Sequence, residues 1–298
     1  MRIDGILAER RPVFSFEFFP PKTDEGLVNL RETLAVLSDD APDFVSVTYG
    51  ALGSTRDTTI DIVKWIKQDL GIEAMAHFTC VGATVEELRS TLDEIEAAGV
   101  DNVLALRGDP PAGQEEWVQT EGGLLYSTEL IALLAERYGF AVGAAAFPEV
   151  HPQAESAESD IRFLKAKQDA GASFLITQLF YDNEFYFDFV DRARDAGITV
   201  PIIPGIMPVI NLRNIRRITE LCKSEIPEPF ERQLEAREND PQALQDLGVA
   251  YATLQCVDLL ARGAPGIHFY TLNRSPATRA ILAALRAAEP WTRAAQPV

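Results

Sequence analysis

Eight short apolar segments recur along the chain, and most are rich in β-branched or aromatic residues. They read as continuous apolar runs rather than alternating ones, which is typical of parallel strands that are buried on both faces. The first three intervals between them are about thirty residues long, the length of one strand–helix unit. The predicted strands are Val13–Phe18, Phe44–Thr48, Ala74–Thr79, Val103–Leu106, Phe140–Ala146, Phe174–Leu179, Pro201–Ile206 and Ile267–Tyr270.

The segments between these strands carry apolar residues at three- and four-residue spacing, the pattern of amphipathic helices. One helix is predicted directly behind Thr23, and a second runs through Ile60–Leu70. Thr84 and Glu87 form a capping box that opens another helix, which Gly99 ends. Further helices are predicted to begin near Ser127, Ser156, Asn183, Asn211 and Ser275.

Two stretches interrupt this alternation of strands and helices. Pro110–Gly123 is a long polar loop after the fourth strand, and Ser224–Gly263 is an insertion before the eighth. Asp240 and Pro241 are expected to cap and start a helix inside the insertion. Its apolar face packs either internally or against another subunit. That face consists of Leu244, Leu247, Tyr251, Leu254 and Val257.

Eight strand–helix units match the (β/α)8 TIM barrel of the α/β class in number and length, with an extra helical insertion before the eighth strand. A doubly wound open sheet with about six strands is the structural alternative. No break in composition divides the 298 residues. Residues 1–298 are therefore expected to form a single (β/α)8 barrel catalytic domain.

The composition narrows the classes of partner. The formal net charge is −18 and the isoelectric point is about 4.6, which disfavours binding to nucleic acid or to anionic membranes. No signal-peptide core or long apolar run occurs. The three cysteines are widely separated and there are only three histidines, so no metal site is expected. These features predict a soluble cytoplasmic protein.

Polar residues gather at the carboxyl ends of the predicted strands, where barrel enzymes place their active sites. Burying such groups within apolar runs is costly unless they are paired, so their clustering predicts a lined pocket. Glu17 lies between Phe16 and Phe18, and burial there is expected to raise its pKa. The alternatives are that Glu17 pairs with a core arginine and that His77 is an ordinary core histidine.

Several common motifs are absent from the sequence. It contains no G-x-G-x-x-G, G-x-x-x-x-G-K-[ST], G-x-S-x-G or H-E-x-x-H string. Rossmann-type dinucleotide binding, P-loop, α/β-hydrolase and zincin chemistry are therefore unsupported. The residues alone predict a barrel enzyme with a carboxylate acid and a polar, aromatic pocket.

The strings at the strand ends resemble, in order, those of the methylenetetrahydrofolate reductases. They are FSFEFFPPK, FVSVTYG, AHFTC, NVLALRGDPP, AAFPEVHP, DAGASFLITQLFYD, PIIPGIMPV and HFYTLNR, which together extend from Phe14 to Arg274. The length resembles that of the compact bacterial members, which consist of the catalytic domain. The resemblance implies a barrel that holds FAD and reduces 5,10-methylenetetrahydrofolate to 5-methyltetrahydrofolate, in one-carbon metabolism that feeds methionine synthesis. NADH or NADPH would reduce the FAD first and folate would reoxidise it, in a ping-pong cycle. A homo-oligomer is also expected.

The resemblance also implies roles for individual residues. Glu17 would be the general acid that opens the folate ring to an iminium cation, and Asp109 would stay ionised to favour that cation. The implied FAD contacts are Thr48, His77, Arg107, Gly108, Asp109, Tyr126, Phe147, His151, Asp160 and Lys167. The implied substrate contacts are Gln178, Asn214, Ile218, Tyr270 and Arg274. Arg107, Lys167 and Arg274 are expected to make the barrel mouth locally positive.

The chain departs from some relatives at four of its helical positions. Phe163 and Ala166 stand where those relatives carry polar or basic residues toward the FAD phosphates, and Asn214 and Ile218 replace glutamine and phenylalanine. The first pair bears on flavin affinity, and the second bears on the packing of folate and nicotinamide. Two other functions stay open, a flavin-free barrel lyase or pterin-binding transferase and a binding protein that has kept only the barrel.

Overall fold

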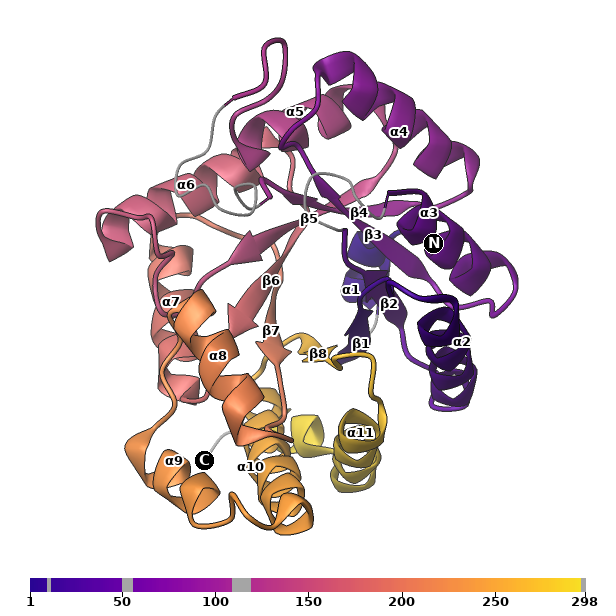
Figure 1. Ribbon diagram of the computed structural model, residues 1–298. Helices are drawn as coiled ribbons and strands as arrows, with labels where there is room; N and C mark the ends of the chain where they lie inside the picture. The colour runs from indigo at the N-terminus through magenta and orange to yellow at the C-terminus, as the bar shows by residue number, and fades with distance from the viewer. Residues whose placement is uncertain (10–11, 50–55, 109–118, 296–298) are drawn as a thin grey trace.

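Eight parallel strands close into a barrel in the computed structural model, which describes residues 1–9, 12–49, 56–108 and 119–295 (Figure 1). Strand β1 pairs with both β2 and β8, so the sheet has no edge and the open-sheet alternative is wrong. All eight predicted strands are present within one residue of their expected ends. They are β1 Val13–Phe18, β2 Phe44–Val47, β3 Ala74–Thr79, β4 Asn102–Leu106, β5 Ala141–Ala146, β6 Phe174–Leu179, β7 Ile202–Ile206 and β8 Gly266–Tyr270.

The helices surround the barrel, and their starts follow the predicted capping residues (Figure 1). The side chain of Thr23 accepts a hydrogen bond from the N–H of Gly26, and Thr84 and Glu87 form the expected capping box. The bounds are α1 Ile3–Glu9, α2 Asp24–Ser38, α3 Arg56–Gln68, α4 Val85–Ala97, α5 Ser127–Arg137, α6 Ala157–Ala170, α7 Asn183–Asp195, α8 Leu212–Cys222, α9 Glu228–Glu235, α10 Pro241–Ala261, α11 Pro276–Ala288 and a terminal 3₁₀ helix, Pro290–Ala295.

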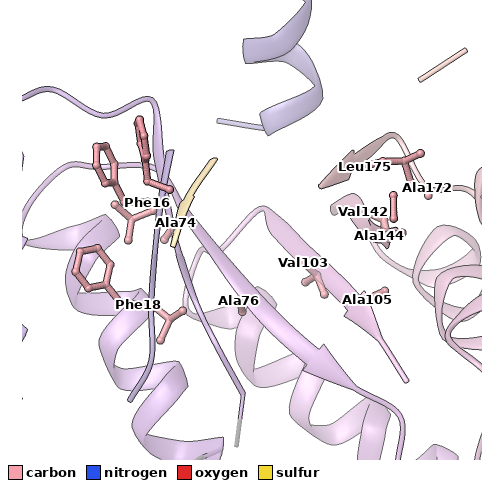
Figure 2. Close-up of a cluster of buried hydrophobic side chains, with 14 of the residues drawn as sticks. Phe16, Phe18, Ala74, Ala76, Val103, Ala105, Val142, Ala144, Ala172 and Leu175 are labelled. Carbon is pink, nitrogen blue, oxygen red and sulfur yellow. The ribbon is translucent and has the colours of Figure 1, made fainter. Parts of the chain in front are cut away.

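The two faces of each strand have different environments. Outward-facing residues, such as Phe16 and Phe18 of β1, pack in one apolar layer between the strands and the helices, and Figure 2 draws part of this layer. Inward-facing residues alternate with them, because successive side chains of a strand point to opposite faces. Inward-facing residues near the amino ends of the strands are mostly apolar, apart from Asn102, whereas Glu17, His77 and Tyr270 lie near the carboxyl ends, at the other mouth.

Helix α1 closes the other end of the barrel, and the sequence analysis did not predict it. Its Ile3, Ile6 and Leu7 are almost completely buried against inward-facing residues at the bottom of the strands, including Phe44 and Phe174. The N–H of Ile3 donates to Oδ1 of the buried Asn102, at 2.7 Å. Burial of each of these aliphatic side chains contributes roughly 1.5–3 kcal/mol, so α1 acts as an apolar plug.

The insertion before β8 holds two helices, α9 and α10, where the sequence predicted one. Leu244 and Tyr251 of α10 pack against α8 and α9, so most of the predicted apolar face is covered within the chain, although Leu254 stays 71% exposed. A Cβ at Gly248 would lie 1.8 Å from the carbonyl oxygen of Val209. Helix α10 can therefore approach the loop after β7 closely only because it carries glycine there.

Three negative observations hold for the part of the chain that the structure describes. No helix there is long and apolar enough to cross a membrane. No group of three or more His, Cys, Asp or Glu side chains there is arranged to hold a metal ion. The three cysteines form no disulfide with one another within the described residues, and burial raises the pKa of the Cys80 thiol to about 11.

Candidate active site

The strand register brings predicted site residues together at the carboxyl end of the barrel. Glu17 of β1 is level with Ser46 of β2 on one side and with Tyr270 of β8 on the other. Thr48 directly follows β2, and His77 lies on the inward face of β3. The side chains predicted from separate segments of sequence therefore form one row around the rim.

Glu17 lies between two imidazoles inside the barrel. Its Oε2 is 3.3 Å from Nε2 of His268 and 3.2 Å from Nε2 of His77, which is buried but not aligned for a hydrogen bond. The Glu17 side chain is 17% exposed, and His268 is completely buried. The hydroxyl of Ser15 lies 2.7 Å from Nδ1 of His268, so a serine, a histidine and a carboxylate form a continuous chain.

This arrangement corrects the expected pKa of Glu17. Burial by itself raises the pKa of Glu17, but attraction to His77 and the hydrogen bond with His268 outweigh it and lower the pKa to about 2. The phenylalanines that prompted the opposite expectation, Phe16 and Phe18, lie in the outer apolar layer, on the other face of β1. In the free protein Glu17 is therefore an ionised carboxylate paired with imidazole.

Ser15 and His268 are candidate site residues that the sequence analysis missed. Both are buried polar residues, and both lie two positions from a predicted site residue, Glu17 or Tyr270, on the same strand. Residues two apart on a strand share a face. Applying that period to Glu17 and Tyr270 would have placed Ser15 and His268 inside the barrel with them.

Tyr270 spans the barrel interior above β7. Its hydroxyl donates to the carbonyl oxygen of Thr177 at 2.7 Å, and its ring meets the ring of His268 edge-on, at 5.4 Å between centroids. Burial raises the pKa of Tyr270. A Cβ at Gly205 would lie 2.3 Å from the Thr177 oxygen and 2.6 Å from the Tyr270 ring. Glycine at this position leaves the space that the tyrosine crosses.

A second group of side chains lies at the ends of β4 and β5. Nη2 of Arg107 donates to Oε1 of Gln153 at 2.6 Å, and the ring of Phe147 meets that of His151 edge-on at 4.5 Å between centroids. The N–H of His151 donates to Oδ2 of Asp160 at 2.9 Å. The N–H of Gln153 in turn donates to Nδ1 of His151 at 3.0 Å, so four of the predicted FAD residues are linked on one side of the rim.

Lys167 belongs to the same region, where its Nζ donates to the carbonyl oxygen of Ala145 at 2.8 Å. Burial lowers the pKa of Lys167 to about 8, while Asp160 raises it and Arg107 lowers it further. Lys167 is therefore still mainly charged at neutral pH. Within the described residues, no carboxylate lies at ion-pair distance from Lys167, although Asp160 is close enough to raise its pKa, and the locally positive mouth stays a prediction.

The other predicted residues are more dispersed. Gly108 follows Arg107 with a φ of +97°, the conformation that favours glycine. Oε1 of Gln178 accepts the N–H of Leu179, at 2.9 Å, next to an irregularity between β6 and β7. Asp109 lies outside the described residues. Tyr126 directly precedes α5, and Asn214 is exposed in the first turn of α8. Ile218 is half-buried against apolar residues of α8, α9 and α10. Arg274 lines a cavity of about 560 Å³ beside α2, α10 and α11.

Glu149 is a carboxylate near the site that the sequence analysis did not single out. Its Oε2 accepts the N–H of Glu225, at 2.8 Å, while its Oε1 is buried without a hydrogen-bond partner among the described residues. Burial raises the pKa of Glu149 to about 7; the N–H of Glu225 opposes the rise, and the carboxylates of Glu225 and Asp182 add to it. Glu149 ties the loop after β5 to the segment between α8 and α9.

Glu149→Gln is expected to stabilise the protein increasingly as the pH rises from about 5 to 8. The native pKa of Glu149 is above the ordinary value of 4.5, so the stability linked to its proton is present below that value and is lost as the pH rises through about 7. The gain at pH 8 should be on the order of 1–2 kcal/mol. Melting temperatures against pH would measure it, with Glu155→Gln as an exposed control. A constant difference across this range would contradict the prediction.

Comparison with known proteins shows which family the chain resembles. The family model described as methylenetetrahydrofolate reductase matches residues 2–286. A probable methylenetetrahydrofolate reductase (NADH) of Oryza sativa subsp. japonica is 40% identical over 292 residues, which cover 94% of this chain and 49% of the relative. The chain thus spans about half the length of such curated plant relatives. The 5,10-methylenetetrahydrofolate reductase of Salmonella typhimurium is 42% identical over 268 residues, covering 90% of this chain and 88% of the relative.

A solved structure supports the fold. An uncharacterized protein from Clostridium thermocellum, whose structure binds two copies of 5-methyl-5,6,7,8-tetrahydrofolic acid, aligns with a TM-score of 0.63 over 96% of this chain and 98% of its own. Its sequence identity is 18%, so the likeness concerns the barrel fold alone.

Proposed function

The chain belongs to the methylenetetrahydrofolate reductase family, and from this premise we propose that it reduces 5,10-methylenetetrahydrofolate to 5-methyltetrahydrofolate with NADH or NADPH through bound FAD. The observation that carries the proposal is the carboxylate held between two imidazoles at a rim that also presents cations and aromatic rings. The first group suits proton transfer, and the second suits a planar, anionic cofactor.

The residues at the rim fit FAD in their chemistry. Arg107 and Lys167 offer positive charge for a pyrophosphate, and Phe147 offers an aromatic face beside them. His77, whose Nε2 lies 3.2 Å from Oε2 of Glu17, is also a proposed contact. FAD, when bound, accepts hydride from the nicotinamide and passes it to folate. Thr48, Gly108, Tyr126, His151 and Asp160 are the remaining proposed contacts.

Proton delivery to folate is the task we assign to Glu17, His268 and Ser15. The bridged folate opens to its iminium form when a proton reaches the departing nitrogen. Because Glu17 is ionised in the free protein, it must first receive a proton, and Nε2 of His268, 3.3 Å from its Oε2, is the route we propose. In the tautomer that carries a hydrogen on Nδ1, His268 can donate it to the hydroxyl of Ser15, 2.7 Å away. Asp109 is proposed to favour the iminium charge.

The folate and the nicotinamide are proposed to occupy the part of the rim formed by β6, β8 and α8. Gln178 would hydrogen-bond the pterin or the nicotinamide amide, and Tyr270 would form the floor beneath it. Arg274, which is exposed, would attract a carboxylate of the substrate. Asn214 and Ile218 would contact the p-aminobenzoate portion from α8.

The test begins with the visible spectrum of the purified protein and its response to added FAD. Anaerobic NADH or NADPH is expected to bleach the flavin absorbance, and 5,10-methylenetetrahydrofolate is expected to restore it. The two half-reactions also give the preference between the nicotinamides. A protein that takes up no flavin would favour a flavin-free barrel enzyme. A reduced protein that methylenetetrahydrofolate fails to reoxidise would favour a binding protein.

A further inference from the structure

Helix α6 carries a large aromatic side chain that is not buried in the fold. Phe163 is 62% exposed, although full burial of a phenylalanine would contribute roughly 1.5–3 kcal/mol. The helix buries Ser159, Ile161 and Leu164 against the barrel, so Phe163 lies outside its packing face. The exposed phenyl group is therefore available to a ligand.

Phe163 shares one side of α6 with two residues of the proposed flavin site. Asp160, Phe163 and Lys167 follow one another at spacings of three and four, which puts them in a row along the helix. Both neighbours reach the barrel rim, since Asp160 accepts the N–H of His151 at 2.9 Å and Nζ of Lys167 donates to Ala145 at 2.8 Å. Long side chains of a helix lean toward its amino end, which for α6 is the rim, so the phenyl group also leans toward it.

A second exposed aromatic residue precedes the neighbouring helix. Tyr126, just before α5, is 53% exposed. Helices α5 and α6 lie side by side (Figure 1), and a Cβ at Gly171, just past α6, would lie 2.6 Å from Cβ of Ala135 in α5. Both helices begin at the rim, because each follows a strand that ends there. Tyr126 and Phe163 are therefore two exposed rings on neighbouring helices, each in the half of its helix nearer the rim.

We propose that Phe163 is a stacking surface for the adenine ring of FAD, with Tyr126 as its companion on α5. The proposal rests on the flavin-dependent function proposed above. Arg107 and Lys167 suit the pyrophosphate, and adenosine is the part of FAD that extends beyond the pyrophosphate, away from the flavin ring. Adenine presents an uncharged aromatic face, and an uncharged phenyl group can stack on it.

This assignment gives the exposed phenylalanine a specific consequence. Stacking would supply affinity for FAD but none for FMN, which has no adenine. Contacts between charged groups weaken with salt, whereas stacking of neutral rings is insensitive to it. Phe163 would thus favour binding of FAD over FMN. Its contribution to the affinity for FAD would depend little on salt concentration.

The test is titration of flavin-free full-length protein with FAD and, separately, with FMN, followed by flavin fluorescence. Phe163→Ala is expected to weaken FAD binding between about fivefold and a hundredfold, the range of aromatic–base stacking, and to leave FMN binding unchanged. Phe163→Trp should restore the affinity for FAD. Leu254→Ala, at a residue that is 71% exposed on α10, is the matched control and should change neither.

The possible results distinguish failure of the stacking proposal from failure of the proposed flavoenzyme function. If Phe163→Ala binds FAD as tightly as the unaltered protein, or loses FAD and FMN equally, the stacking role is overturned and the flavoenzyme assignment is untouched. If the unaltered protein binds neither flavin, both proposals fail. A selective loss of FAD affinity that tryptophan restores supports the assignment of Phe163.

Discussion

Glu17→Gln is expected to slow the reduction of methylenetetrahydrofolate by about 10²-fold or more, within the usual contribution of general acid catalysis. Glutamine keeps the shape of the side chain but has no exchangeable acid proton to give. The proposed path from Nε2 of His268, 3.3 Å from Oε2 of Glu17, to the substrate would then be broken. Reduction of the flavin by the nicotinamide requires no such proton, so that half-reaction should keep its rate.

Stopped-flow measurement of the two half-reactions tests this prediction. In each variant, the rate of flavin reduction by the nicotinamide is the control for the rate of the folate half-reaction. His268→Gln, which keeps the carboxylate but removes the imidazole, should also slow the folate half-reaction selectively. An unchanged folate rate in Glu17→Gln would remove this residue from the mechanism.

The low pKa of Glu17 also has a consequence for stability. Its pKa in the folded protein is about 2 against an ordinary value of 4.5, so the linked stability is present above about pH 4.5 and is lost as the pH falls toward 2. Glu17→Gln should therefore lose less stability over that acid range than the unaltered protein. Melting temperatures at pH 5 and pH 3 would show the difference.

Gly205→Ala is expected to lower the stability by about 2–4 kcal/mol and to impair the folate half-reaction together with it. The added Cβ would meet the carbonyl oxygen of Thr177 at 2.3 Å and the ring of Tyr270 at 2.6 Å. Tyr270 would have to move and lose its 2.7 Å hydrogen bond to Thr177. Since its ring contacts His268, that movement would reach the proposed proton donor.

Thermal unfolding and folate half-reaction rates measure both effects. Gly139→Ala is the matched control, since a Cβ there meets nothing within 4 Å, and it should behave like the unaltered protein. Tyr270→Leu in the Gly205→Ala background should recover part of the stability, because it relieves the contact with the ring. Full stability and full activity of Gly205→Ala would show that Tyr270 is not held as described.

The strands could be predicted closely because their apolar runs are continuous and their ends are marked. The capping residues Thr23, Thr84 and Asp240 likewise fixed where three helices begin, since each bonds backbone groups only two or three residues away. By contrast, the sequence did not predict helix α1. Its three buried apolar residues are explained by the open barrel end that they fill.

The sequence by itself determined the barrel, the order of its elements and the rim positions of Glu17, His77, Arg107 and Tyr270, because each depends on neighbours along the chain. The fold decided the ionisation of Glu17: its neighbours in sequence are phenylalanines, but its neighbours in space are His77 and His268. Residues 60 and 251 positions away set its pKa, since electrostatic interaction depends on distance in space. The same closure of β1 onto β8 gave Ser15 and His268 their place beside it.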